Sequence, residues 1–91
     1  MAMVYITLKI MPENPEIDLT QLAEKAKLIV SEFEGNVMEC VEEPVAFGLK
    51  SVNITFSRDE AKGTSDDVED KLNDLEEVAS VTVADVRRGI G

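Results

Sequence analysis

Histidine and tryptophan are absent from this chain of 91 residues, and cysteine occurs only once, as Cys40. The absence of histidine removes the side chain most often used as a general acid or base near neutral pH, and it excludes histidine-containing triads and zinc sites. A lone cysteine forms neither an intrachain disulfide nor the Cys-x-x-Cys pair of a metal carrier. We therefore expect no hydrolytic enzyme, no metal site and no cofactor.

Long apolar runs and basic residues are also scarce. No run approaches the roughly 20 apolar residues that span a bilayer, and the N-terminus lacks the basic segment and apolar core of a signal peptide. Nine basic residues against 19 acidic ones give a formal net charge of −10, which repels nucleic acid phosphates and anionic membranes. We expect a soluble, cytoplasmic protein that binds neither nucleic acid nor membrane directly. A positively charged or Mg²⁺-bearing partner suits it better.

The first half of the chain alternates between two hydrophobic periods. Residues 4–10 carry an apolar side chain at every second position, which is typical of a half-buried strand. Residues 18–35 repeat apolar side chains at helical spacing, with Asp18 as the predicted N-cap and Gly35 as the predicted C-cap. Further strands are predicted over 37–43 and 50–58, the latter with three inward side chains: Val52, Ile54 and Phe56.

The second half continues the pattern with one more helix and one more strand. Gly63 breaks the chain, and Thr64 with Asp67 forms a predicted capping box ahead of a narrow apolar stripe of Val68, Leu72 and Leu75. Residues 78–86 are rich in β-branched side chains and predict a fourth strand, after which residues 87–91 trail off. The order β-α-β-β-α-β predicts one α+β domain over 1–91. We expect a ferredoxin-like sandwich, with a four-stranded antiparallel sheet and two helices on one face.

Such a sheet leaves one face open, and many unrelated functions use this fold. An RNA-recognition module would stack bases on aromatic side chains of the central strands within a basic surface, but the third strand offers Asn53 and Thr55 and the charge is negative. A phosphatase would need an anion cradle after the first strand, where "PENPEID" is acidic and contains two prolines. A protein-binding module and a small regulatory or ligand-sensing domain remain.

The stretch "EEPVAFGLKSVNITF", together with "VASVTVADVRR" near the chain end, resembles the guanine-nucleotide exchange domain family of translation elongation factor 1 beta, and most of all its short archaeal form. The most specific part is the run P-[IV]-[GA]-[FY]-G-[IL]-K, which residues 44–50 match. The resemblance implies a factor that binds the GTPase elongation factor 1 alpha and speeds release of its GDP. Such a factor breaks no bond and has no small-molecule substrate of its own.

The resemblance also implies partner-binding residues. The aromatic residue of the run is an exposed contact to the GTPase in that family, which corresponds to Phe47, and Gly48 allows the sharp turn beside it. Lys50 completes the run. Eukaryotic members place a lysine next to the C-terminus, whereas this chain has Arg88 at the matching place and continues for three residues, so we expect Arg88 to drive GDP release and Arg87 to support docking.

Each of these residues also has a structural interpretation. Phe47 could fold back over the sheet edge, Lys50 could be an edge-strand charge that discourages aggregation, and the two arginines could simply end the strand. Met38 and Cys40 are expected on the core face of their strand, with the cysteine as a small buried hydrophobe. The acidic residues of segment 66–77 lack the spacing of a Ca²⁺ loop and predict a solvated helix face.

Overall fold

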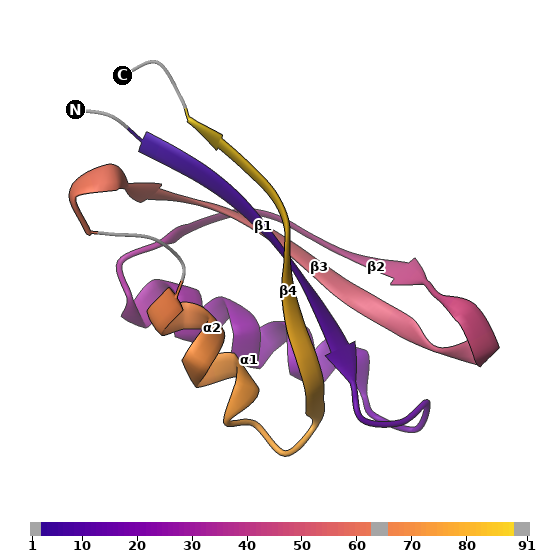
Figure 1. Cartoon of the computed structure of the whole chain (residues 1–91). Coiled ribbons are helices and arrows are strands. Elements are labelled where there is room, and N and C mark those ends of the chain that lie inside the picture. Colours follow the sequence, from indigo (N-terminus) through magenta and orange to yellow (C-terminus); the bar gives the residue numbers. More distant parts are fainter. Residues whose placement is uncertain (1–2, 63–65, 89–91) are drawn as a thin grey trace.

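A single four-stranded sheet with both helices on one face organises the computed structural model, which describes residues 3–62 and 66–88 (Figure 1). Neighbouring strands are all antiparallel, and the strand order is β2-β3-β1-β4. The elements in chain order are β1 (Met3–Pro12), α1 (Leu19–Glu32), β2 (Asn36–Pro44), the 3₁₀ turn η1 (Ala46–Gly48), β3 (Lys50–Asp59), the 3₁₀ turn η2 (Glu60–Lys62), α2 (Asp66–Asn73) and β4 (Val78–Arg88). The predicted ferredoxin-like arrangement is confirmed.

The alternation in β1 separates a core from an open face. Its even-numbered residues are buried beneath the helices, while its odd-numbered residues are half-exposed on the other side of the sheet. β3 has the same phase, because antiparallel partners such as Ile6 and Phe56 point to the same side. The buried side chains of both strands pack against Leu22, Ala26 and Val30 of α1. We call the helix-free side of the sheet the open face.

The ends of α1 confirm one predicted cap and correct the other. The Asp18 carboxylate accepts hydrogen bonds from the backbone N–H groups of Thr20 and Gln21, as an N-cap does. At the C-terminal end, however, Glu34 takes the left-handed conformation with φ of 62°. Its N–H donates to the Ser31 carbonyl, and the Gly35 N–H donates to that of Val30. This is a Schellman motif in which Phe33 is the C-cap and Glu34, rather than the predicted Gly35, takes the left-handed position.

Gly35, which follows Glu34, must be a glycine because a side chain would not fit at this position. A Cβ atom on this residue would lie 2.5 Å from Val30 Cγ1 and 3.1 Å from a ring carbon of Phe56. Such a separation is far below van der Waals contact, and both neighbours are fully buried. The glycine therefore lets the chain leave α1 close against the core rather than supplying the positive φ.

A β-bulge in β2 corrects the prediction that Met38 shares the core face with Cys40. Val37 pairs with Phe56 and Glu39 pairs with the next residue, Thr55, so Met38 is extra in the ladder. The bulge changes the phase of the strand. Val37 and Cys40 pack against the core, whereas Met38 is 57% exposed. Burial raises the pKa of the Cys40 thiol.

The edge strand β4 is longer than predicted, because it includes Arg87 and Arg88. Thr7 pairs with Asp85 while Leu8 pairs with Val83, which leaves Ala84 as a bulged residue. A second register shift leaves Ala79 unpaired near the start of the strand. Bulges of this kind interrupt the regular edge that another chain would pair with.

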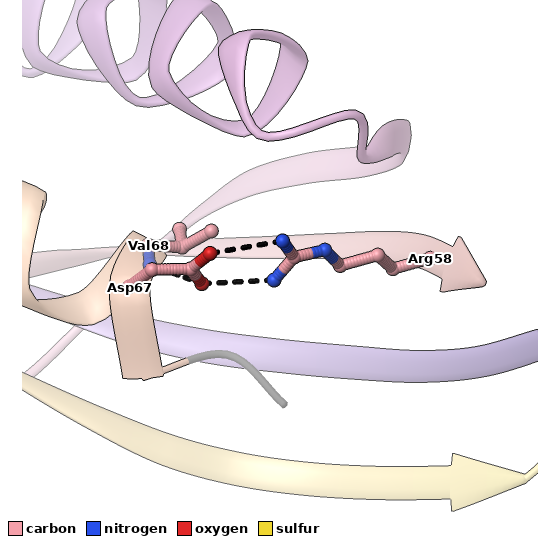
Figure 2. A network of polar contacts seen from close by, with 3 residues as sticks. All are labelled: Arg58, Asp67 and Val68. Atoms are coloured by element: carbon pink, nitrogen blue, oxygen red, sulfur yellow. Dashed lines mark hydrogen bonds and ion pairs between the residues drawn. The ribbon is translucent and has the colours of Figure 1, made fainter. Parts of the chain in front are cut away.

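An ion pair between β3 and α2 joins the sheet to the second helix (Figure 2). Arg58 is only 4% exposed, and its two terminal nitrogens donate to the two carboxylate oxygens of Asp67 at 2.8 and 2.9 Å. The hydrogen bond from Arg58 is the main cause that lowers the pKa of Asp67. Asp67 was predicted to close a capping box with Thr64, which lies outside the described residues.

The rest of the acidic segment departs from a simple solvated helix face. α2 ends at Asn73, so Asp74, Glu76 and Glu77 lie in the turn before β4. Glu77 accepts a hydrogen bond from Lys25 of α1, which lowers its pKa. This contact ties the turn to the first helix.

Candidate functional site

The β2–β3 hairpin carries three of the predicted partner-binding residues. Its turn is η1, closed by a hydrogen bond from the Val45 N–H to the Leu49 carbonyl at 2.7 Å. Gly48 has φ of 77°, and no atom lies within 4 Å of the position that a Cβ would occupy there. The glycine is therefore required by backbone conformation and not by crowding. The Phe47 backbone belongs to this turn, and its side chain lies outside what the structure describes.

Lys50 begins β3 beside this turn, opposite Pro44 of β2. Because β3 lies between β2 and β1, the interpretation of Lys50 as an edge-strand charge is wrong. Its exposed side chain and Gly48 line a groove of about 290 Å³. The opposite wall of the groove comes from the β1–α1 loop and the first turn of α1. The hairpin end thus offers both a projecting turn and a recess.

The two arginines lie at the end of β4 on opposite faces of the sheet. Arg87 pairs with Tyr5 and so points to the open face, where its Nε donates to Asp85 at 2.8 Å. Arg88 pairs with Val4 and so points to the helix side, where its guanidinium lies 3.2 Å from the carboxylate of Glu60. Both side chains remain more than three-quarters exposed.

The hairpin residues and the arginines do not form one cluster. Arg88 lies beside the first residues of β1, and the hairpin lies beyond the other end of that strand. Figure 1 shows the C-terminal end of β4 and the β2–β3 hairpin at opposite ends of the sheet. We call these regions the arginine end and the hairpin end. A partner that contacts both must extend along the whole sheet.

Sequence reasoning missed Arg58, the most buried charged side chain among the described residues. A signal was available, because Arg58 continues the inward alternation of Val52, Ile54 and Phe56. A charge at such a position needs a partner in the core-facing layer, and the acidic start of α2 supplies it. This ion pair is structural, since Asp67 occupies both terminal nitrogens of the guanidinium.

The described part of the chain has neither a membrane-spanning helix nor a metal-binding group. Within residues 3–62 and 66–88, no helix is long and apolar enough to cross a membrane. The same residues contain no group of three or more acidic or cysteine side chains placed to hold a metal ion.

Known proteins resemble this chain over nearly its full length. The model of one family, described as the EF-1 guanine nucleotide exchange domain, matches residues 5–88. Elongation factor 1-beta of Methanosphaera stadtmanae is 42% identical over 88 residues, which cover 97% of this chain and 98% of the relative. Elongation factor 1-beta of Methanobrevibacter smithii is 39% identical over 89 residues, with 97% and 98% coverage.

Solved structures of other proteins share the fold at low identity. The ACT domain from GTP pyrophosphokinase of Chlorobium tepidum superposes with a TM-score of 0.57 at 20% identity, covering 87% of this chain and 95% of that domain. The C-terminal domain of the MgtC protein from Mycobacterium tuberculosis superposes with a TM-score of 0.63 at 13% identity, covering 96% and 87%. At these identities the likeness concerns the fold alone.

Proposed function

Because the chain belongs to the EF-1 guanine nucleotide exchange domain family, we propose that it promotes release of GDP from elongation factor 1 alpha, which then reloads with GTP during translation elongation. The observation that carries this proposal is the family match over residues 5–88, together with relatives that align along almost their entire length. The chain acts by binding and breaks no bond in a substrate. Its partner is the GTPase, and we propose no direct binding to nucleic acid or membrane.

Exchange is a coupling between two binding events. An exchange protein binds the nucleotide-free GTPase more tightly than the GDP-bound form. By reciprocity, it lowers the affinity of the GTPase for GDP by the same ratio by which GDP lowers the affinity of the GTPase for the exchange protein. A coupling of about 3 kcal/mol corresponds to a roughly 150-fold change in affinity. The factor must therefore reach the nucleotide region as well as hold the partner.

We assign these two tasks to the two ends of the sheet. At the hairpin end, Phe47 beside Gly48 is the anchor, because a large rigid ring on a projecting turn suits a partner pocket. Lys50 is exposed next to the same groove. At the arginine end, Arg87 supports docking and Arg88 promotes release.

Arg88 has the chemistry to disturb a nucleotide site. A GTPase holds Mg²⁺ between phosphate oxygens and protein oxygens. A guanidinium presents a broad fork that binds a carboxylate or phosphate through two hydrogen bonds. Arg88 therefore competes for oxygens that hold the metal rather than occupying the metal position, and loss of the metal loosens GDP. Its exposed contact with Glu60 is weak enough to exchange for such a partner.

A nucleotide-release assay tests the proposal. The GTPase is loaded with fluorescent GDP, and dissociation is followed in excess unlabelled nucleotide with and without this protein. We expect faster release that saturates as the protein concentration rises. Chain denatured before addition provides the control. An unchanged dissociation rate at saturating concentration, or no complex in a pull-down with the nucleotide-free GTPase, would contradict the proposal.

A further inference from the structure

We propose that the open face of the sheet is the central docking surface for the GTPase and that Lys9 lies at its middle. This inference rests on the proposed function and assigns the surface between the hairpin end and the arginine end. The surface is the half-exposed middle of this face on the two central strands: Tyr5, Thr7, Lys9, Met11, Asn53 and Thr55. We call these six side chains the central strip; Ser51 and Ser57 share the face but are buried.

The central strip contains no carboxylate, although the chain has 19 acidic residues; the next open-face pair beyond Tyr5 and Ser57 is Met3 with Asp59. The helices differ sharply, since four of the eight residues of α2 are acidic. Three members of the strip, Tyr5, Thr7 and Thr55, instead carry hydroxyl groups, and the hydroxyls of Thr7 and Thr55 lie 2.9 Å apart. Its single charge is Lys9, which pairs with Asn53 on one side and Thr82 on the other.

Acidic side chains return at both edges of this face. Glu39 on β2 and Asp85 on β4 lie in register with Thr55 and Thr7. Glu43 lies opposite Ser51 farther along β2, and Asp59 ends β3 at the arginine end. Asp85 is already paired with Arg87, and Glu43 accepts a hydrogen bond from Asn53. Protein interfaces have this anatomy, with Asp and Glu depleted from the core and charge retained at the rim. A buried, unpaired carboxylate would carry a large desolvation penalty.

The position of the central strip connects the two proposed contacts. It runs along β1 between the arginine end and the hairpin end, and the open face is free of helices (Figure 1). With strand dimensions of ~3.3 Å per residue and ~4.8 Å between strands, residues 5–11 of β1 and their partners on the other three strands cover roughly 20 by 14 Å. That is about 280 Å², well under half of the ~800 Å² that each partner contributes to a standard interface. The two ends supply the remainder.

The chemistry of this face favours the GTPase over a second copy of the chain. Stable homodimer interfaces are more apolar than this polar strip, which has a lysine at its middle. A twofold dimer through this face would also bring together the acidic rims of two chains that each carry a net charge of −10. An exchange factor must leave its partner after each cycle, and a polar face with an acidic rim suits a transient complex with a partner that offers basic groups.

A matched pair of charge reversals tests the assignment. Lys9→Glu places a carboxylate in the central strip, whereas Lys71→Glu makes the same change in net charge on the exposed side of α2. We expect Lys9→Glu to weaken binding to the nucleotide-free GTPase at least tenfold and Lys71→Glu to weaken it less than threefold. Lys9→Gln, which adds no negative charge, should show an intermediate loss. Thermal unfolding of each variant checks that it is folded.

A second measurement does not depend on any substitution. In methyl-labelled protein, the signals of Met3 and Met11 on the open face should shift when the GTPase is added. The signals of Leu28, which is 65% exposed on α1, should stay in place. Equal losses of affinity for the two lysine reversals, together with unshifted methionine signals, would overturn the assignment of this surface. The exchange function would still stand if the wild-type protein accelerated GDP release. Concentration-dependent methionine shifts without the GTPase would instead identify a second copy as the occupant.

Discussion

Phe47 is the residue on which the hairpin contact depends most. Its neighbour Gly48 adopts a positive φ with open space around it, so the turn is shaped by the backbone and not by packing against the core. We therefore predict that Phe47→Ala changes the free energy of unfolding by no more than about 1 kcal/mol, as at surface sites. Binding to the GTPase should weaken by roughly 2 kcal/mol or more, as at an interface hot spot.

Leu28→Ala is the matched control, because it truncates a large exposed side chain far from the proposed contacts. Titration calorimetry and thermal unfolding measure the two quantities on the same samples. A large fall in melting temperature for Phe47→Ala would place the ring against the fold and not in the partner.

Arg88 should influence release more than binding. We predict that Arg88→Ala slows the stimulated release of GDP at least tenfold, which is about 1.4 kcal/mol in the barrier, with a much smaller loss of affinity for the nucleotide-free GTPase. Arg87→Ala should show the opposite balance, because this side chain lies on the open face. Stopped-flow release and equilibrium binding separate the two effects. If Arg88→Ala lowered both equally or neither, another group would have to displace Mg²⁺.

At the scale of elements, the ion pair between Arg58 and Asp67 is the main polar tie between α2 and the sheet. Asp67→Asn keeps the shape of the side chain but removes the charge that balances a buried guanidinium. Breaking a fully buried pair costs about 3–5 kcal/mol. Because the Asp67 side chain is 43% exposed, solvent screening reduces this value, and we predict a loss of about 2 kcal/mol in the free energy of unfolding at neutral pH.

The same pair predicts a pH dependence. The hydrogen bond from Arg58 lowers the pKa of Asp67 in the folded state, so its stabilisation is present above the unfolded value of about 3.9. It is lost as the pH falls through the lowered folded pKa. Urea unfolding between pH 7 and pH 2 should therefore show the Asp67→Asn deficit shrinking toward zero in acid. Asp66→Asn, which removes a carboxylate from the same first turn of α2, is the matched control.

The elements themselves followed from local patterns, but their irregularities did not. The alternation in β1 and the cap at Asp18 depend on neighbouring residues, and both were predicted. The bulge at Met38 depends on how β2 aligns with β3, and the left-handed Glu34 depends on how closely Gly35 must approach Val30. Such features arise from long-range packing, which a single strand or helix pattern does not encode.

At the scale of the whole molecule, the acidic charge should affect how fast the partner binds. A net charge of −10 attracts a basic surface from beyond contact distance, and the acidic rim of the open face adds to this field. We predict that the association rate with the GTPase falls steeply between low and physiological ionic strength, while the dissociation rate changes little. Stopped-flow binding at several salt concentrations measures both. An association rate that stays constant would limit the charge to a role in solubility.

The candidate site illustrates what a motif predicts and what it omits. The run from Pro44 to Lys50 located the turn correctly, and the final arginines were placed near the chain end. Their separation by the length of the sheet, and the carboxylate-free strip between them, depend on strand order and register. Neither property is visible until the strands are paired.

The bulged residue Ala84 decides which arginine has which neighbours. Before it, the odd-numbered Val81 and Val83 point toward the helices, and after it the even-numbered Val86 and Arg88 do so. One extra residue therefore inverts the parity of the strand just ahead of its functional end. Deleting Ala84 would remove the extra residue and leave Arg87 and Arg88 on their present sides, whereas pairing Ala84 in a regular ladder would exchange the sides of the two arginines. The face of the sheet on which each arginine lies thus depends on the bulge at Ala84 as well as on the order of the two arginines in the sequence.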